Sequence, residues 1–198
     1  MGEGAASFPT GTVTLMFSDI QGSCVLFDKY GEEFVPLLQR HHSIFRENIR
    51  ANHGWEVGTE GDAFMVAFPT TRDALQCAIA IQRSLWTQSW APLDEPLRVR
   101  MGLHTGAPII ATHPDGKRDY LGPVVNRSAR VMQCAHGGQL VISGVAKEHV
   151  TREMPRLPEG VALVDLGRHR LKGLDQEEQL FQVNYDDVHV KFPPLGTV

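Results

Sequence analysis

The sequence predicts an α+β sandwich, in which helices pack over a mostly antiparallel β-sheet. Two observations predict this fold class. Helical and strand periodicities succeed one another along the chain in the order β-α-ββ-α-ββ-α-β, followed by a small tail. Several strands follow each other as pairs joined by short turns, which is typical of antiparallel hairpins, whereas a doubly wound parallel sheet needs a helix between successive strands.

The first half of the chain predicts a strand, a helix, a hairpin and a second helix. Val13–Phe17 is apolar and rich in strand-forming residues, and it ends at Ser18-Asp19. Apolar residues at helical spacing predict a helix over about 32–52. Residues 56–59 and 63–68 predict a hairpin with Gly61 at its tip. The second helix is expected to start after Thr70, which is a suitable cap.

The second half predicts another hairpin, a third helix and further strands. Leu97–Thr105 alternates as a strand, and Ala107–Ala111 is expected to be its hairpin partner. Residues 113–122 are polar and predict a loop. Proline at the first helical position predicts a helix from Gly122-Pro123 to about His136. Strands are then expected at Leu140–Ser143, at Val161–Leu166 and at Gln179–Val183.

Size and composition are those of a globular protein with one domain. The chain has 198 residues, of which 42% are hydrophobic and 21% charged, and its net charge is −4. This mild acidity gives no reason to expect nucleic acid or an anionic membrane as partner. No apolar run approaches the ~18–20 residues that span a bilayer. The distant cysteines Cys24, Cys77 and Cys134 are expected to be reduced thiols in a cytoplasmic protein.

Two acidic residues occupy comparable places at the ends of predicted strands. Asp19 follows the first strand, and Asp62 lies in the turn between the next two. If those strands are neighbours, both carboxylates emerge at one end of the sheet, which is costly unless a cation neutralises them. Hard oxygen ligands favour Mg²⁺ or Mn²⁺. A metal site is therefore predicted, and the structural alternatives are a helix cap at Asp19 and an ordinary turn residue at Asp62.

A second group of polar residues lies at the start of the third predicted helix. Asn126 and Arg130 are four residues apart, so they share one helix face. An arginine there can stabilise charge on a phosphoryl group, and an asparagine can orient a sugar oxygen. The alternative is a solvated helix face, with Arg127 as another exposed cation.

Four stretches of the chain together resemble a known family. They are F-S-D-I-Q-G-S (17–23), G-D-A-F-M-V-A-F (61–68), R-M-G-L-H-T-G (100–106) and D-Y-L-G-P-V-V-N-R-S-A-R (119–130). In order and spacing they resemble the catalytic domain of class III nucleotidyl cyclases, the adenylate/guanylate cyclase family, of the bacterial type. The resemblance implies a ferredoxin-like or palm-like βαββαβ sandwich.

The resemblance also implies where the domain begins and ends. The catalytic domain is expected at residues 11–185, after an N-terminal extension at 1–10. Residues 186–198 are expected to be a linker or tail. The closing stretches L-K-G-L-D and F-P-P-L-G resemble bacterial cyclase domains that precede larger regulatory regions, so the tail is compatible with further domains beyond it.

The family's chemistry assigns a role to each of these residues. Asp19 and Asp62, with the backbone carbonyl of Ile20, are implied to bind two divalent ions, Mg²⁺ or Mn²⁺, in each active site. Asn126 is implied to orient the ribose, and Arg130 to stabilise the pentavalent phosphorus. The ribose 3′-oxygen attacks the α-phosphorus, which gives a 3′,5′-cyclic nucleotide and pyrophosphate.

Members of this family act as head-to-tail dimers. One chain supplies the metal aspartates and the other supplies Asn126 and Arg130, so a symmetric homodimer is expected to hold two composite active sites. A basic residue late in the chain binds the triphosphate in this family. Lys172, in H-R-L-K-G, is the candidate here and Arg170 the second choice, whereas either is otherwise a solubilising surface charge.

The base-reading positions are only half filled. The family's adenylate cyclases commonly carry a lysine four residues before the second metal aspartate, and here that position is Gly58. The aspartate that accepts from the adenine amine is present as Asp119. Glu60 shares the strand face of Gly58 and is a further candidate for contact with a base.

These positions favour ATP as substrate and leave two alternatives. Loss of a charged donor removes roughly 1.5–3 kcal/mol of recognition. A cyclase with relaxed or non-adenine selectivity, acting on GTP, CTP or UTP, is therefore one alternative. The other is a degenerate nucleotide-binding or dimerising regulatory module.

Overall fold

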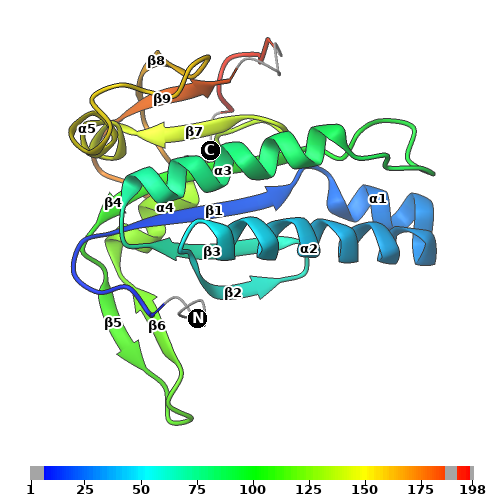
Figure 1. The fold of residues 1–198 in the computed structure, drawn as a ribbon, viewed down its shortest axis with the longest axis horizontal. Coiled ribbons are helices and arrows are strands. Elements are labelled where there is room, and N and C mark those ends of the chain that lie inside the picture. The colour runs from blue at the N-terminus through cyan, green and yellow to red at the C-terminus, as the bar shows by residue number, and fades with distance from the viewer. Residues whose placement is uncertain (1–6, 186–190, 197–198) are drawn as a thin grey trace.

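A central β-sheet with helices on both faces forms the body of the molecule (Figure 1). This computed structural model describes residues 7–185 and 191–196. The main sheet has seven strands in the order β2-β3-β1-β4-β7-β9-β8, and β5 and β6 form a separate pair. The strands are β1 (Val13–Ile20), β2 (Trp55–Glu60), β3 (Ala63–Phe68), β4 (Val99–Gly106), β5 (Ile109–Thr112), β6 (Arg118–Leu121), β7 (Leu140–Ser143), β8 (Ala162–His169) and β9 (Glu178–Asn184). The helices are α1 (Ser23–Tyr30), the short 3₁₀ helix η1 (Gly31–Glu33), α2 (Phe34–Ala51), α3 (Thr71–Thr87), α4 (Pro123–Gln133) and α5 (Gly144–Glu153).

The helices are divided between the two faces of the sheet. Phe45 of α2 and Val150 of α5 belong to the largest buried cluster, which also holds the apolar face of α3. On the other face, Val131 of α4 packs with Val141 and Leu180 of the sheet. Figure 1 shows α2 and α3 in front of β1, with α4 behind it. The predicted α+β sandwich, with its ferredoxin-like βαββαβ pattern and mostly antiparallel sheet, is confirmed.

The strands of the main sheet are antiparallel neighbours except at one place. β1 lies between β3 and β4 and pairs antiparallel with both. β4 and β7 run parallel, with Met101 opposite Leu140 and Leu103 opposite Ile142. The connection between these two strands carries β5, β6 and α4 across the face of the sheet. That crossover places α4 on the face opposite α2 and α3.

A glycine lets α4 approach the sheet closely. A Cβ built on Gly102 of β4 would lie only 2.3 Å from the backbone nitrogen of Met132. No side chain fits in that space, because both neighbouring atoms belong to packed backbone. The absence of a side chain at Gly102 therefore sets how near α4 lies to β4.

The prediction that 107–111 pairs back onto 97–105 is wrong. β5 pairs with β6 instead, with Ile109 opposite Leu121. The physical reason is that β1 and β7 already occupy both edges of β4, so β4 has no backbone groups left to pair with β5. The expected loop at 113–122 accordingly contains a strand, β6. The β5–β6 hairpin extends away from the main sheet (Figure 1).

The helix predictions succeed where an apolar stripe exists. The helix expected over about 32–52 is α2, Phe34–Ala51, and the Thr70 side chain caps α3 by accepting from the Asp73 backbone N–H. α1 and α5 were not expected. α1 has no buried residue, so it lacks the apolar periodicity that marks a helix in a sequence. α5 has only 10 residues and follows directly on β7.

The described residues before β1 hold the β5–β6 hairpin against the body. The Phe8 ring stacks on Tyr120 of β6 with ring centroids 4.5 Å apart. The Arg118 guanidinium lies 4.2 Å from the centroid of the same Phe8 ring. The Tyr120 hydroxyl donates a hydrogen bond of 2.6 Å to the carbonyl oxygen of Pro9. β6 is thus anchored from one side.

The proposed domain boundaries stay a prediction. Residues 1–6, 186–190 and 197–198 lie outside the described part of the chain, so most of the expected extension and most of the expected linker are not described. Gly196 donates a backbone hydrogen bond of 3.1 Å to the carbonyl oxygen of Cys134. Among the described residues, no helix is both long and apolar enough to cross a membrane.

Candidate active site

Asp19 and Asp62 lie together at one end of the main sheet. β1 carries Asp19, and the turn between β2 and β3 carries Asp62. The Asp62 Oδ2 atom accepts a hydrogen bond of 2.7 Å from the backbone N–H of Ile20. Burial, and then the adjoining Asp19 carboxyl, raises the pKa of the Asp62 carboxyl above its ordinary value. The structure therefore brings the two carboxylates and the Ile20 backbone into one place.

The turn that carries Asp62 is held in shape from two sides. Gly61 has a φ of 58°, a left-handed conformation that glycine adopts without strain. The His42 ring of α2 donates from Nε2 to the Gly61 carbonyl oxygen over 2.9 Å. A helix of the covering layer thus fixes the turn next to the Asp62 carboxylate.

Arg100 is a site residue that the sequence analysis missed. It stands directly opposite Asp19 in the pairing of β1 with β4. Its Nη2 and Nε atoms donate to the Asp19 Oδ2 atom at 2.5 and 3.2 Å. This guanidinium offsets part of the repulsion between the two carboxylates. The signal in the sequence was the arginine of R-M-G-L-H-T-G, but its meaning depends on the strand register.

The donor set at this end of the sheet suits a hard divalent cation. Asp19 and Asp62 supply carboxylate oxygens side by side, and the partly buried, mutually repelling pair is stabilised when a cation neutralises it. Within residues 7–185 and 191–196, no group of three or more His, Cys, Asp or Glu side chains could hold a metal. Two carboxylates completed by substrate phosphates are the usual setting for Mg²⁺.

Asn126 and Arg130 both lie on α4. Asn126 is exposed. Arg130 donates from Nη1 to the Oε1 atom of Gln133 on the same helix, over 2.5 Å. Arg100, which binds Asp19, also donates from Nη1 to the Gln133 carbonyl oxygen over 3.5 Å. In the described part of the chain, no hydrogen bond or ion pair joins Asn126 or Arg130 directly to Asp19 or Asp62, and Arg130 is linked to Asp19 through Gln133 and Arg100.

Lys172 and Arg170 lie beside the C-terminal end of α4. Both are exposed, and they flank Leu171, which is buried with Val131 and Cys134 of that helix. The turn that holds them follows β8, at the edge of the sheet opposite to β2. The basic candidates therefore lie close to the helix that carries Asn126 and Arg130.

A buried ion pair supports α4 from beneath. The Arg127 Nη1 atom lies 3.2 Å from the Glu178 Oε2 atom of β9, and Glu178 is only 7% exposed. The His104 Nδ1 atom of β4 is hydrogen bonded to the Ser143 Oγ atom at 2.7 Å. Burial, aided by the positive charge of Arg127, lowers the pKa of His104 to about 4. Arg127 is thus an internal anchor of α4, not the free surface cation that the sequence allowed.

The two positions that are expected to read the base line one cavity. Gly58 and Asp119 both border a hollow of about 300 Å³, whose apolar wall includes Phe17 and Met65. Lys117, just before β6, lines the same cavity. A Cβ built on Gly58 would meet nothing within 4 Å, so the missing side chain leaves open space. Lys117 was not singled out from the sequence, because its place depends on the pairing of β5 with β6.

Residues 6–184 match the family model described as the adenylate and guanylate cyclase catalytic domain. The chain belongs to this cyclase family. An uncharacterized protein of Mycobacterium tuberculosis is 39% identical over 194 residues, which cover 96% of this chain and 61% of the relative. The adenylate cyclase of Neurospora crassa is 32% identical over 222 residues, which cover 88% of this chain and 10% of the relative. The cyclase domain thus spans only part of the length of these relatives.

Solved cyclase structures share the fold. A structure of adenylate cyclases from Trypanosoma brucei in their monomeric state has a TM-score of 0.84 at 26% identity, and covers 96% of this chain and 95% of its own. The adenylyl cyclase CyaB from P. aeruginosa has a TM-score of 0.76 at 24% identity, covering 93% of this chain and 97% of its own, which shows a common fold. The resemblance to class III cyclases that the four sequence stretches indicate is confirmed.

Proposed function

We propose that this cyclase domain converts ATP into 3′,5′-cyclic AMP and pyrophosphate, and that it does so as a head-to-tail homodimer. The observation that supports this most is the adjacent pair Asp19 and Asp62, which approach each other closely at a partly buried turn. Two adjacent carboxylates do not stabilise the folded state, because their negative charges repel each other. They suit a cation and the triphosphate that a cation accompanies.

The carboxylate pair can hold the divalent cations that accompany a nucleoside triphosphate. Divalent ions, Mg²⁺ or Mn²⁺, bound by Asp19, Asp62 and the Ile20 carbonyl would supply neutralisation of the triphosphate and acidify the ribose 3′-hydroxyl. Arg100 holds the Asp19 carboxylate through two donors and so keeps its oxygens in a fixed place. The Ile20 N–H does the same for Asp62.

The α4 end supplies the groups that act on the reacting atoms. As the 3′-oxygen bonds to the α-phosphorus and the bond to pyrophosphate breaks, negative charge grows on the phosphoryl oxygens. The Arg130 guanidinium donates to that charge, and Asn126 holds the ribose so that attack proceeds in line. Lys172, or its neighbour Arg170, binds the triphosphate as a cation.

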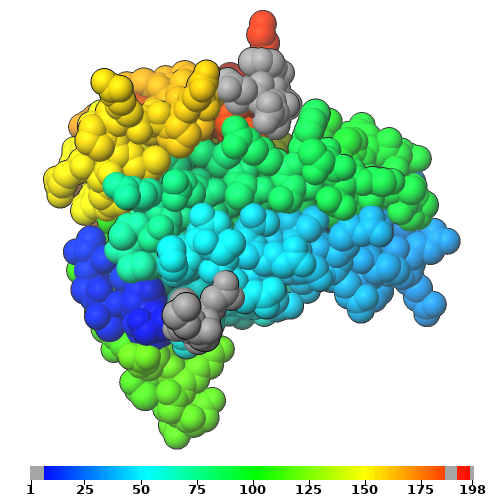
Figure 2. All heavy atoms as spheres, in the orientation of Figure 1, coloured from blue at the N-terminus to red at the C-terminus, as the bar shows by residue number. Residues whose placement is uncertain are grey.

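Two observations support the composite site of a homodimer. In the described part of one chain, no hydrogen bond or ion pair joins Asn126 or Arg130 directly to Asp19 or Asp62, which leaves both side chains available to a site shared with a second copy. The β5–β6 hairpin also exposes apolar side chains: Ile109 is 62% exposed, Ile110 40% and Leu121 50%. Figure 2 shows this hairpin projecting from the body in yellow-green. An apolar projection of this kind suits association with a second copy.

The substrate assignment rests on the base cavity. Asp119 borders it and offers a carboxylate to an exocyclic amine, which favours adenine. The open space at Gly58 favours relaxed or non-adenine selectivity as the second candidate, because no donor projects from that position.

A substrate panel tests this proposal. Purified protein is given ATP, GTP, CTP and UTP in turn, with Mg²⁺ or Mn²⁺, and the products are identified by mass spectrometry. We expect cyclic AMP and pyrophosphate from ATP at the highest kcat/KM. Absence of every cyclic nucleotide, at protein concentrations where a dimer is seen by light scattering, would refute the activity. A higher kcat/KM for another nucleotide would refute the substrate.

The proposal places the protein in the cytoplasm. Cys24 is exposed, Cys77 and Cys134 are buried, and all three are free thiols in the structure. Free thiols persist in reducing compartments, which supports this location. The proposed substrate, ATP, is abundant there.

A further inference from the structure

The cavity beside Gly58 is bordered by apolar side chains and by three charged ones. Its wall is largely apolar, with Phe17 of β1, Val57 of β2 and Met65 of β3. Its volume of about 300 Å³ is at the small end of the range for small-molecule sites. The polar groups at its rim are Glu60, Lys117 and Asp119. Two of the three come from the β5–β6 hairpin side.

A β-bulge turns Gly58 toward this cavity. The register between β2 and β3 shifts between Glu56 and Gly58, so that Gly58 stands opposite Met65. Met65 lies on the sheet face away from α2 and α3, in the cluster with Val57 and Tyr120. Bulges commonly re-aim a position beside an active site. A side chain at 58 would therefore enter the cavity, and the glycine leaves that room to the ligand or to another residue.

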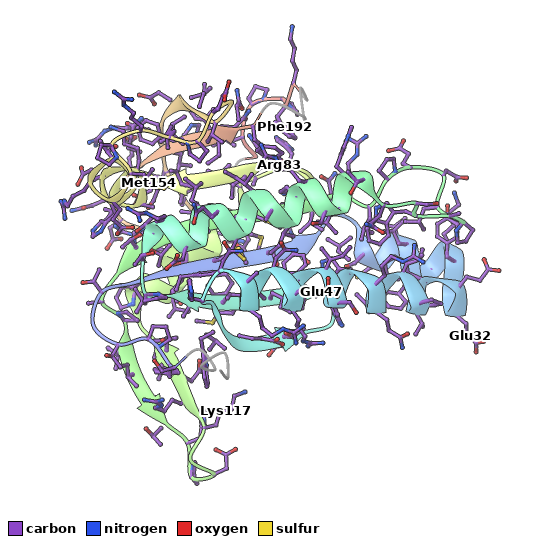
Figure 3. All side chains as sticks on the ribbon, viewed as in Figure 1. Glu32, Glu47, Arg83, Lys117, Met154 and Phe192 are labelled. Carbon is purple, nitrogen blue, oxygen red and sulfur yellow. The ribbon has the colours of Figure 1, made fainter. Side chains whose placement is uncertain are left out.

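The Lys117 side chain borders the same cavity and can occupy the space left open at Gly58. Alternate residues of a strand point to the same side, so Lys117 and Asp119 face one way while Arg118 and Tyr120 face the other. Arg118 and Tyr120 pack on Phe8, which fixes the orientation of the strand. Lys117 and Asp119 are accordingly turned to the cavity that both of them line. Figure 3 labels Lys117 on the β5–β6 hairpin.

Charge distinguishes Lys117 from the other groups at the rim. Glu60 and Asp119 are acceptors, and among the described residues that line this cavity Lys117 is the basic one. Adenine presents a donor, its 6-amino group, next to an acceptor, N1. Guanine presents the reverse pattern, an acceptor at C6 and a donor at N1. A lysine beside an aspartate matches the adenine edge when the aspartate takes the amino group.

We propose that Lys117 is a specificity-determining residue that supplies the donor absent at Gly58, so that Lys117 and Asp119 together read the adenine edge. The base-reading pair then comes from β6 and the residue just before it, instead of being divided between β2 and β6. This inference rests on the proposed cyclase function. It differs from that proposal in assigning a base contact to a residue outside all four family stretches.

Removal of the ammonium group tests the assignment. Lys117→Met keeps the length of the side chain and removes its charge, and Lys191→Met, at another exposed lysine, is the matched control. We expect the ratio of kcat/KM for ATP to that for GTP to fall about 10- to 100-fold in Lys117→Met, the loss that removal of a charged donor causes. The control keeps the wild-type ratio. An unchanged ratio in Lys117→Met would overturn the proposal.

A lysine returned to the cavity from β2 provides the complementary test. The double variant Gly58→Lys/Lys117→Met places the donor at 58, where a Cβ meets nothing within 4 Å. We expect it to regain most of the ATP preference lost in Lys117→Met. If the double variant stays unselective while its thermal midpoint matches wild type, Lys117 does not act as the base donor.

Binding measurements keep this inference separate from turnover. Calorimetric titration of the same variants with the non-cyclisable α,β-methylene analogues of ATP and GTP measures base selection without the chemical step. A wild-type protein that binds the ATP analogue but makes no cyclic nucleotide would refute the proposed function alone. Equal weakening of both analogues by Lys117→Met would show a general phosphate or surface effect, and would overturn the role of Lys117.

Discussion

The carboxylate pair and the functional residues of α4 are held in place in different ways. Asp19 and Asp62 are fixed directly by groups of their own chain, the Arg100 guanidinium and the Ile20 N–H. Asn126, by contrast, stands exposed on α4 and has no such direct partner among the described residues. The rigid contacts at this end lie one layer below, where α4 meets the sheet.

This difference shows which contacts fix the positions of the functional side chains in each half of the site. The carboxylate half is organised by the hydrogen bonds of the functional groups themselves. The α4 half is organised by how the whole helix sits, through the Arg127–Glu178 pair and the close approach at Gly102. Buried contacts that touch no substrate are therefore expected to control the reactivity of Arg130.

The largest expected effect separates the two halves onto different chains. Asp19→Ala and Arg130→Ala each remove one half, and each variant alone is expected to lose activity by about 100-fold or more. Mixed in equal amounts, they should regain about a quarter of wild-type activity, because half of the dimers then contain one intact composite site. Cyclic AMP formation in the mixture measures this. No recovery in a mixture that demonstrably exchanges subunits would contradict the composite site.

The next effect concerns the close approach of α4 to the sheet. Gly102→Ala places a methyl group 2.3 Å from the Met132 nitrogen, so α4 must move outward. Overpacking of this kind typically costs about 1–3 kcal/mol, which urea unfolding measures. Gly58→Ala is the matched control and should leave stability nearly unchanged, since its Cβ meets nothing. Equal stability of the two variants would show that the helix adapts without cost.

A smaller effect is expected at the buried ion pair under α4. Glu178→Gln removes the charge that faces Arg127 but keeps the shape of the side chain. Because Arg130 then loses part of its orientation, kcat should fall about 10-fold with little change in KM. Glu177→Gln, at the exposed neighbour, is the control. A change in KM alone would indicate a role in substrate binding instead of helix placement.

A further effect concerns the pH dependence of stability and leaves activity at neutral pH nearly unchanged. The pKa of His104 is about 4 in the folded protein, below the ordinary value of 6.5, because of burial and then the charge of Arg127. Between these two values the unfolded chain binds a proton that the folded protein does not. This group therefore destabilises the fold as pH falls from 6.5 to 4, by up to about 3 kcal/mol.

His104→Gln measures that contribution. The glutamine does not titrate and can still bond Ser143, so urea midpoints between pH 6.5 and 4 should decline less steeply than in wild type. Activity at neutral pH should change little. Identical slopes for the variant and the wild type would show that His104 does not carry this part of the acid sensitivity.

The sequence predicted what depends on local pattern and on the order of motifs. The Asp19 and Asp62 pair was found because both residues follow strand signals that recur at comparable places. The partner of β5 was predicted wrongly, because a strand signal does not state which edge it will join. Arg100 and Lys117 were missed for the same reason, since each gains its place through register across strands.

The parallel contact between β4 and β7 gives the molecule an order of assembly. Everything that forms the carboxylate end, from β1 to β4, leaves the ribosome before β7 does. α4 emerges in between, but its packing partners Val141 and Leu180 belong to later strands. In a nascent chain, Asp19 and Asp62 are therefore expected to reach their places before Arg130 does.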